Sequence, residues 1–167
     1  MLIFQLIVLA ALVYIIVLLS YSMFRGAPFA ALSANRIETM LELLQPVKGK
    51  KLVDLGSGDG RIVISFGKRG IESYGYEIVP LIYIWSLIKI KSKKVKKTKV
   101  ILGDYWNIDL SEFDYVTVWG TPYMMGRLEK KLQKELKPGS KVVSNHFQFP
   151  NWKAKSKKND VYLYVSK

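Results

Sequence analysis

Short apolar runs alternate along the chain with segments whose apolar positions have a helical spacing. Strands are predicted at the apolar runs, which cover residues 52–55, 71–77, 100–102, 113–119, 141–144 and 161–165. A weaker strand is predicted at 152–157, antiparallel to the last of these. Helices are predicted at residues 35–44, 61–69, 80–91 and 127–136. This alternation of strands and helices predicts an α/β fold.

The N-terminal stretch follows neither pattern, because residues 2–24 are almost entirely apolar and carry no charge. About 23 residues at about 1.5 Å each could cross a bilayer core of about 30 Å. A cleaved signal peptide is disfavoured, because no basic segment precedes the apolar stretch and the stretch is too long. We therefore predict a transmembrane anchor at residues 1–25 and a second domain at 26–167. Arg25 and the lysines beyond it place that domain in the cytoplasm.

A glycine-rich turn, residues 54–60 with the sequence DLGSGDG, connects the first predicted strand to a helix. Such a unit binds nucleotides in α/β folds. Glycine is needed because the turn is tight and its backbone must approach a ligand where a Cβ would collide. The N–H groups at the start of the helix then face that ligand.

The spacing of the glycines in this turn distinguishes between classes of cofactor. A dinucleotide site needs a small residue where this chain has Arg61, and no Gly-Lys-Ser/Thr follows for a P-loop. Asp54 and Asp59 flank the turn, and two carboxylates would repel a pyrophosphate. They suit a ligand with an ammonium and a sulfonium group, which describes S-adenosylmethionine.

Composition limits the other possibilities. The 167 residues fit one domain, and half of them are hydrophobic, which is enough for a core. The chain has no cysteine and only one histidine, His146, so no metal site is expected. The net charge of +13 points to an anionic neighbour, which would be nucleic acid or a lipid surface.

The motif D/E-x-G-x-G-x-G, matched in full by residues 54–60, resembles the first motif of the class I (Rossmann-like) methyltransferases. Glu77, about twenty residues beyond the turn at a strand end, is placed to accept both ribose hydroxyls. The resemblance implies that Asp104 binds the adenine amine, that Tyr105 or Trp106 covers the ring, and that S-adenosylmethionine is the cofactor. The predicted cofactor residues are Asp54, Gly56, Ser57, Gly58, Asp59, Glu77, Asp104 and Tyr105.

Several later stretches narrow the resemblance. Residues 128–132 (LEKKL), 143–147 (VSNHF) and 150–152 (PNW), together with the N-terminal apolar segment, are similar to small membrane-anchored protein-lysine methyltransferases of mitochondria and to their archaeal cousins. This implies methylation of a lysine on a protein in or at a membrane, and a sheet order of 3-2-1-4-5-7-6. It also implies that the segment before the helix at 35–44 covers the cofactor, which adds Phe29 and Ser33 to the cofactor residues; Ser33 is equally suited to cap that helix.

The amine to be methylated would approach the carboxyl edge of the sheet. Thr121, Tyr123 and Asn145 follow predicted strands at this edge and are the candidates for aligning the amine. The N/D-P-P-Y/F/W signature of enzymes that methylate amide or adenine nitrogens is not present. No dedicated catalytic base is required, because desolvation next to a sulfonium favours the neutral amine.

The basic segments leave alternatives open. Residues 80–91 are apolar on more than one face, and residues 89–99 contain seven lysines. An anionic lipid surface is the expected partner of this region. RNA binding is disfavoured because no aromatic residue is interleaved with these lysines. An RNA or small-molecule methyltransferase, and a non-catalytic module that binds S-adenosylmethionine at a membrane, remain the alternative functions.

Overall fold

The computed structural model describes the backbone of residues 1–25 and 32–167, and all side chains in these ranges except those of residues 18, 19 and 21–25. The helices are α1 Leu2–Arg25, α2 Ala34–Leu44, α3 Arg61–Gly67, α4 Pro80–Lys93 and α5 Pro122–Glu135, with a short 3-10 turn at Tyr105–Asn107. The strands are β1 Lys51–Leu55, β2 Glu72–Glu77, β3 Thr98–Leu102, β4 Tyr115–Val118, β5 Lys141–Asn145, β6 Ser156–Lys158 and β7 Val161–Val165.

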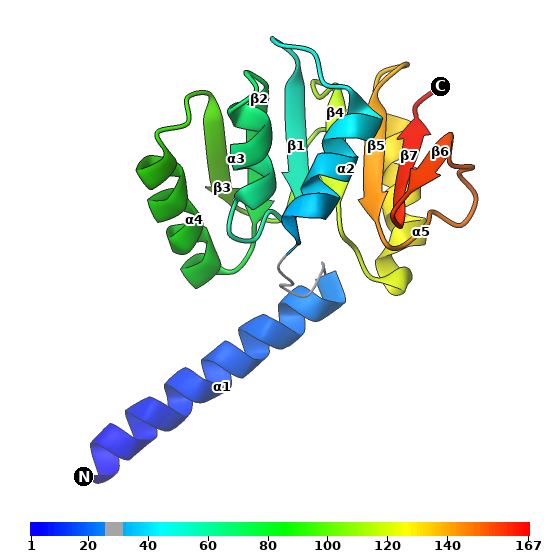
Figure 1. The fold of residues 1–167 in the computed structure, drawn as a ribbon. Coiled ribbons are helices and arrows are strands. Elements are labelled where there is room, and N and C mark those ends of the chain that lie inside the picture. Colours follow the sequence, from blue (N-terminus) through cyan, green and yellow to red (C-terminus); the bar gives the residue numbers. More distant parts are fainter. Residues whose placement is uncertain (26–31) are drawn as a thin grey trace.

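One seven-stranded sheet organises these elements, in the order β3-β2-β1-β4-β5-β7-β6 (Figure 1). The five strands from β3 to β5 are parallel, and β7 runs antiparallel to both β5 and β6. The order expected from the resemblance is therefore confirmed. Because the five parallel strands all end at the same edge, the loops that follow them meet there.

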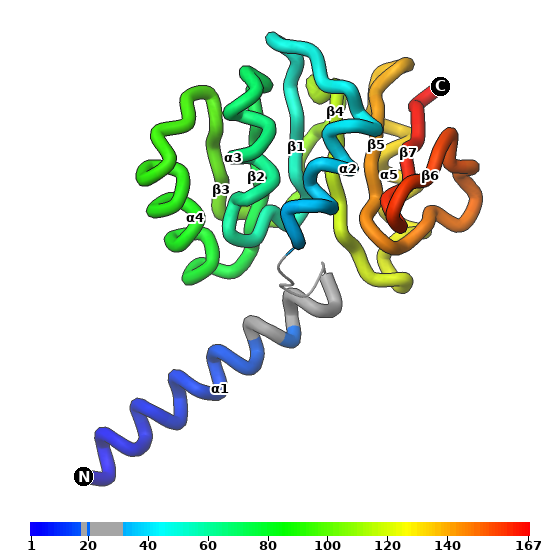
Figure 2. Tube along the Cα trace, in the orientation of Figure 1, coloured from blue at the N-terminus to red at the C-terminus, as the bar shows by residue number. Residues whose placement is uncertain are grey.

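Helices cover both faces of the sheet. Helices α2, α3 and α4 lie on one face and α5 lies on the other (Figures 1 and 2). Strands β1, β4, β5 and β7 send alternate side chains into two separate cores, so Leu52 faces α2 and α3 while Val53 faces α5. This two-sided burial explains why the central strands are continuous apolar runs in the sequence.

Most predicted elements are present, with shifted ends. Helix α5 begins at Pro122, five residues before the predicted start, because proline is favoured in the first turn of a helix. The weak strand predicted at 152–157 is shorter and lies at 156–158 as an exposed edge strand. It pairs antiparallel with β7, as predicted.

The prediction of a transmembrane anchor is wrong. Among the residues whose side chains are described, no helix combines the length and the apolar character that crossing a bilayer requires. A spanning helix needs about 20 consecutive apolar residues. The predicted single-pass localisation, with a cytoplasmic catalytic domain, depended on this anchor and is therefore not supported either.

Candidate functional site

The glycine turn lies at the carboxyl edge of the sheet, between β1 and α3. Gly56, Gly58 and Gly60 have φ angles of 82°, 54° and 77°, which only glycine adopts without strain. The backbone N–H groups of Gly56 and Ser57 donate to the carbonyl of Tyr76 at 3.0 and 2.9 Å. These bonds tie the turn to the end of β2.

Gly75 in β2 lies directly against Ser57 of the glycine turn. A Cβ at this position would lie 2.5 Å from the Cβ of Ser57 and 2.6 Å from its Oγ. Contacts this short do not occur in real structures, so any larger residue would push the turn away from the sheet. The bare backbone at Gly75 is therefore what allows Ser57 to pack down on β2.

Asp54, the first residue of the motif, is fully buried at the end of β1. Its Oδ1 accepts a hydrogen bond from Thr117 Oγ1 at 2.7 Å. Its Oδ2 and the hydroxyl of Ser57 are buried with no partner among the described residues. Burial, together with the nearby carboxylates of Glu77 and Asp59, raises the pKa of Asp54 to about 7, although the Thr117 hydrogen bond opposes this rise.

Glu77 lies at the end of the neighbouring strand and is also buried. Its carboxylate accepts from the backbone N–H of Gly58 at 2.9 Å and from that of Val79 at 2.8 Å. Asp104 follows the next strand, and its Oδ1 accepts from the backbone N–H of Trp106 at 3.0 Å. A bond from the N–H of Gly103 to the carbonyl of Glu77 holds these two strand ends together.

Asp59 is held by cations of the chain itself. Arg61 and Lys89 both form ion pairs with its carboxylate. Burial opposes ionisation, but the hydrogen bonds from these two side chains outweigh it and lower the pKa of Asp59 to about 2. Arg61 also donates to the carbonyl of Leu32 at 2.6 Å, so it connects the glycine turn to the segment before α2. This geometry supports the turn, and a direct contact of Asp59 with a cofactor stays a prediction.

The two aromatic candidates for covering an adenine ring differ in burial. Tyr105 is buried in the core on the α5 face, and its hydroxyl donates to the sulfur of Met124 at 3.6 Å. Burial raises the pKa of this hydroxyl. Trp106 is half-buried, with the guanidinium of Arg127 at 4.1 Å from its ring centre. Phe29, the remaining predicted cofactor residue, lies outside the described residues.

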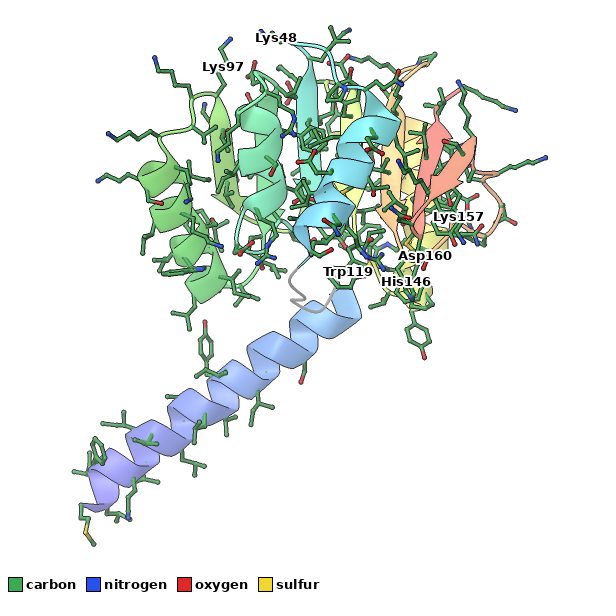
Figure 3. All side chains as sticks on the ribbon, in the orientation of Figure 1. Lys48, Lys97, Trp119, His146, Lys157 and Asp160 are labelled. Atoms are coloured by element: carbon green, nitrogen blue, oxygen red, sulfur yellow. The ribbon has the colours of Figure 1, made fainter. Side chains whose placement is uncertain are left out.

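A pocket lies further along the same edge, at the ends of β4 and β5. It is called the second pocket below, to distinguish it from the part of the edge around the glycine turn. Its volume is about 340 Å³, and it is lined by Leu32, Ser33, Arg36, Trp119, Asn145 and His146. Figure 3 shows Trp119 and His146 at the edge where the strand arrows end. The side-chain amide of Asn145 is buried, and its Oδ1 accepts from Arg36 at 2.6 Å. The pocket thus combines an aromatic wall with a fixed cation and an oriented amide.

The other predicted residues are placed as follows. Ser33 is the N-cap of α2, as predicted, but its side chain makes no capping hydrogen bond and lines the second pocket. Thr121 is the N-cap of α5, next to the end of β4. Tyr123 is 97% exposed, so its side chain points into solvent. Of the three residues predicted to align an amine, Asn145 is the one that lines the pocket.

The residues at this edge fit a cationic cofactor. Asp54 offers a buried carboxylate oxygen without a partner among the described residues, and the glycine turn offers backbone that approaches closely without a Cβ. An ammonium or sulfonium group would compensate the buried carboxylate. Glu77 and Asp104 extend this acidic edge across two further strand ends, which suits the hydroxyl and amine donors of an adenosine.

This sheet order, with a glycine turn after β1 and acidic residues at or just beyond the ends of β1, β2 and β3, defines the fold and cofactor edge of a class I methyltransferase. The chain belongs to the family of the ANTKMT methyltransferase domain, whose model matches residues 54–156. S-adenosylmethionine is accordingly the cofactor of this domain.

Named relatives include protein-lysine methyltransferases. A lysine N-methyltransferase of Homo sapiens, named for a subunit of the ATP synthase, is 37% identical over 126 residues, covering 75% of this chain and 54% of that one. A protein-lysine N-methyltransferase of Saccharolobus islandicus is 31% identical over 149 residues, covering 83% of this chain and 92% of that one. The chain spans 51–58% of the length of the vertebrate methyltransferases that are named for the ATP synthase.

Among solved structures, an RNA methyltransferase of Salinibacter ruber bound to S-adenosyl-L-homocysteine matches with a TM-score of 0.75 and 30% identity. This match covers 82% of our chain and 92% of that protein. The fold and the cofactor edge are therefore shared by relatives named for different substrates.

Gly75, Thr117, Arg36 and Lys89 are among the residues of the site that escaped prediction from the sequence. Gly75 and Thr117 had a usable signal, because a glycine and a polar side chain interrupt buried strands. Arg36 and Lys89 had none, because their partners Asn145 and Asp59 lie 109 and 30 residues away in the chain.

We predict that Gly75→Ala weakens the binding of S-adenosylmethionine at least about tenfold, or about 1.4 kcal/mol. The added methyl group would displace Ser57 and, with it, the glycine turn. The affinity is measured by titration calorimetry, and circular dichroism checks that the variant is folded. Gly126→Ala is the matched control, because its Cβ would lie 3.6 Å from the nearest atom, an ordinary contact. A folded Gly75→Ala variant with full affinity would contradict this role.

Proposed function

We propose that the chain is a protein-lysine N-methyltransferase that uses S-adenosylmethionine. The observation that carries this proposal is the match to the archaeal protein-lysine N-methyltransferase, 92% of whose length the chain spans. The two adjacent parts of the carboxyl edge support it. An acidic, glycine-lined part suits the cationic cofactor, and a separate pocket at the ends of β4 and β5 is available for an amine.

The chemistry requires a neutral amine. When bound, S-adenosylmethionine supplies an electrophilic methyl group on a sulfonium. A free lysine has a pKa near 10.4, so only about one in a few thousand is neutral at pH 7. The chain can favour the neutral form by removing water from the amine in the second pocket. The guanidinium of Arg36 lines that pocket and disfavours a second positive charge there.

Roles follow for the predicted residues. Asp54, Glu77 and Asp104 would bind the ammonium, ribose and adenine groups of the cofactor, with Gly56, Ser57 and Gly58 providing close backbone contacts. On the amine side, the buried amide of Asn145 is held by Arg36 and is the best oriented aligning group. Holding the amine in line with the methyl group supplies much of the remaining acceleration.

We also propose that the protein substrate lies in or at a membrane and that an anionic lipid surface is a partner of the chain. The net charge of +13 supports this, because the surface of the chain is attracted to anionic headgroups.

We predict that the purified chain transfers a labelled methyl group from S-adenosylmethionine to protein in extracts of cells that lack its gene. After acid hydrolysis the label is expected in methyllysine. Glu77→Gln should reduce the rate of methyl transfer at least about tenfold. In this variant an NH2 group, which donates, replaces one of the two carboxylate oxygens that accept hydrogen bonds. Glu112→Gln is the matched control, since Glu112 is exposed and pairs with Lys51 at the start of β1.

Two results would contradict the proposal. Label that resists protease but is released by ribonuclease would mean an RNA methyltransferase, the activity for which the Salinibacter ruber protein is named. Binding of S-adenosylmethionine without transfer to any fraction would mean a non-catalytic module.

A second prediction concerns the second pocket, where the amine is proposed to bind. Asn145→Ala should lower the turnover rate about tenfold, the effect of losing one aligning hydrogen bond, and leave the affinity for S-adenosylmethionine within about twofold. Single-turnover kinetics and calorimetry measure the two quantities. Asn151→Ala, at an exposed site, should change neither. If Asn145→Ala turned over at the normal rate, the pocket would not be the site of transfer.

A further inference from the structure

Helix α4 packs on the domain through one narrow face. Ser86 is its only buried residue. Tyr83 and Ile90, on the same side, contact the core formed with α2 and α3, and Lys89 at the edge of this face pairs with Asp59 in the glycine turn. The inward face of α4 is therefore already occupied.

The opposite face of α4 is apolar and open to solvent. Leu81, Ile84, Trp85 and Ile88 occupy positions i, i+3, i+4 and i+7, which form one stripe along a helix. Their side chains are 67%, 51%, 53% and 54% exposed. A stripe with this spacing usually faces a protein core. Exposed together, four large apolar side chains mark an interaction surface.

Positive charge continues from the end of this stripe. The lysines at the end of α4 and in the turn beyond it are all exposed or partly exposed, and none of them forms a salt bridge with another described residue; they are Lys91, Lys93, Lys94, Lys96 and Lys97. Figure 3 shows Lys97 at the edge of the domain where β3 begins. The surface of α4 is therefore apolar along its length and cationic at its C-terminal end.

We propose that α4 binds the surface of an anionic phospholipid bilayer through the stripe of Leu81, Ile84, Trp85 and Ile88. The apolar side chains would enter the boundary between headgroups and acyl chains, and the lysines would contact the headgroups. Charge complementarity favours lipid over a protein partner, because lysine is depleted at protein interfaces. This inference rests on the lipid partner proposed above and deepens it by naming the face that binds it.

The position of α4 gives this contact a consequence for function. The helix begins at Pro80, three residues after Glu77, and so starts at the carboxyl edge that carries the site. A bilayer surface lying along α4 would reach the same edge. A lysine that projects from a protein at that surface would then be within reach of the site.

A fluorophore on α4 tests this contact directly. Because the chain has no cysteine, a single engineered one can carry an environment-sensitive label, at Ile84→Cys in the stripe or at Val47→Cys as the control. Val47 is 59% exposed and lies outside α4 and the site. Each labelled full-length chain is mixed with vesicles of phosphatidylcholine, with or without phosphatidylserine. The label is the readout because α1 also exposes apolar side chains and could hold the chain on vesicles by itself.

We expect the label of Ile84→Cys to shift to the blue and to be quenched by brominated lipid on phosphatidylserine vesicles, and that of Val47→Cys to stay in water. The apparent affinity seen by the label at position 84 should fall at least about tenfold when four lysines are replaced by glutamine, at positions Lys93, Lys94, Lys96 and Lys97. The same change at Lys153 and Lys155, which lie outside α4, should have little effect.

Two outcomes would overturn the proposal. One is a label at position 84 that stays as exposed as that at position 47 when the chain is bound to vesicles. The other is shielding of position 84 without vesicles that increases with protein concentration, which would assign the stripe to a second copy of the chain. Neither measurement involves methyl transfer, so failure here is distinguishable from failure of the transfer assay.

Discussion

The buried carboxyl group of Asp54 is the constraint on which the rest of the site depends. A charge placed in a protein interior is costly unless it is compensated. Thr117 satisfies one oxygen of this group, and the other has no partner among the described residues. The packing of Ser57 on Gly75 and the ion pairs of Asp59 fix the glycine turn that begins at Asp54. We propose that a cationic cofactor supplies the compensation that the described residues do not.

Local sequence patterns predicted the strands and the glycine turn, because each of these is formed by residues that are close together in the chain. The strands are short apolar runs because the sheet is covered on both faces, and the turn at residues 54–60 needs glycines for steric reasons. Arg36 and Lys89 could not be found in this way, because they act on residues far away in the chain. Tyr123 shows the opposite failure, since its place after β4 suggested a contact that its exposure does not support.

Hydropathy alone identified apolar segments without saying what they contact. Residues 2–24 indicated a membrane span, yet no described helix meets the requirements for one. Residues 80–91 looked like an ordinary helix with too many apolar positions, and the structure explains the excess. Ser86, Tyr83 and Ile90 mark the narrow face that packs on the domain. The apolar side chains on the opposite face form the exposed stripe. The pattern identified a helix in both segments, but only three-dimensional packing distinguishes the face that is buried from the face that is left for a partner.

If a positive charge on the cofactor compensates Asp54, binding of the cofactor should release a proton. In the free chain the pKa of Asp54 is about 7, so near about pH 6 the group is mostly protonated. A bound cation lowers this pKa, so calorimetry in buffers of different ionisation enthalpy should detect release of about one proton with S-adenosylmethionine. The Asp54→Asn variant should release none. Tight binding to the unaltered chain without proton release would mean that the cofactor does not compensate Asp54.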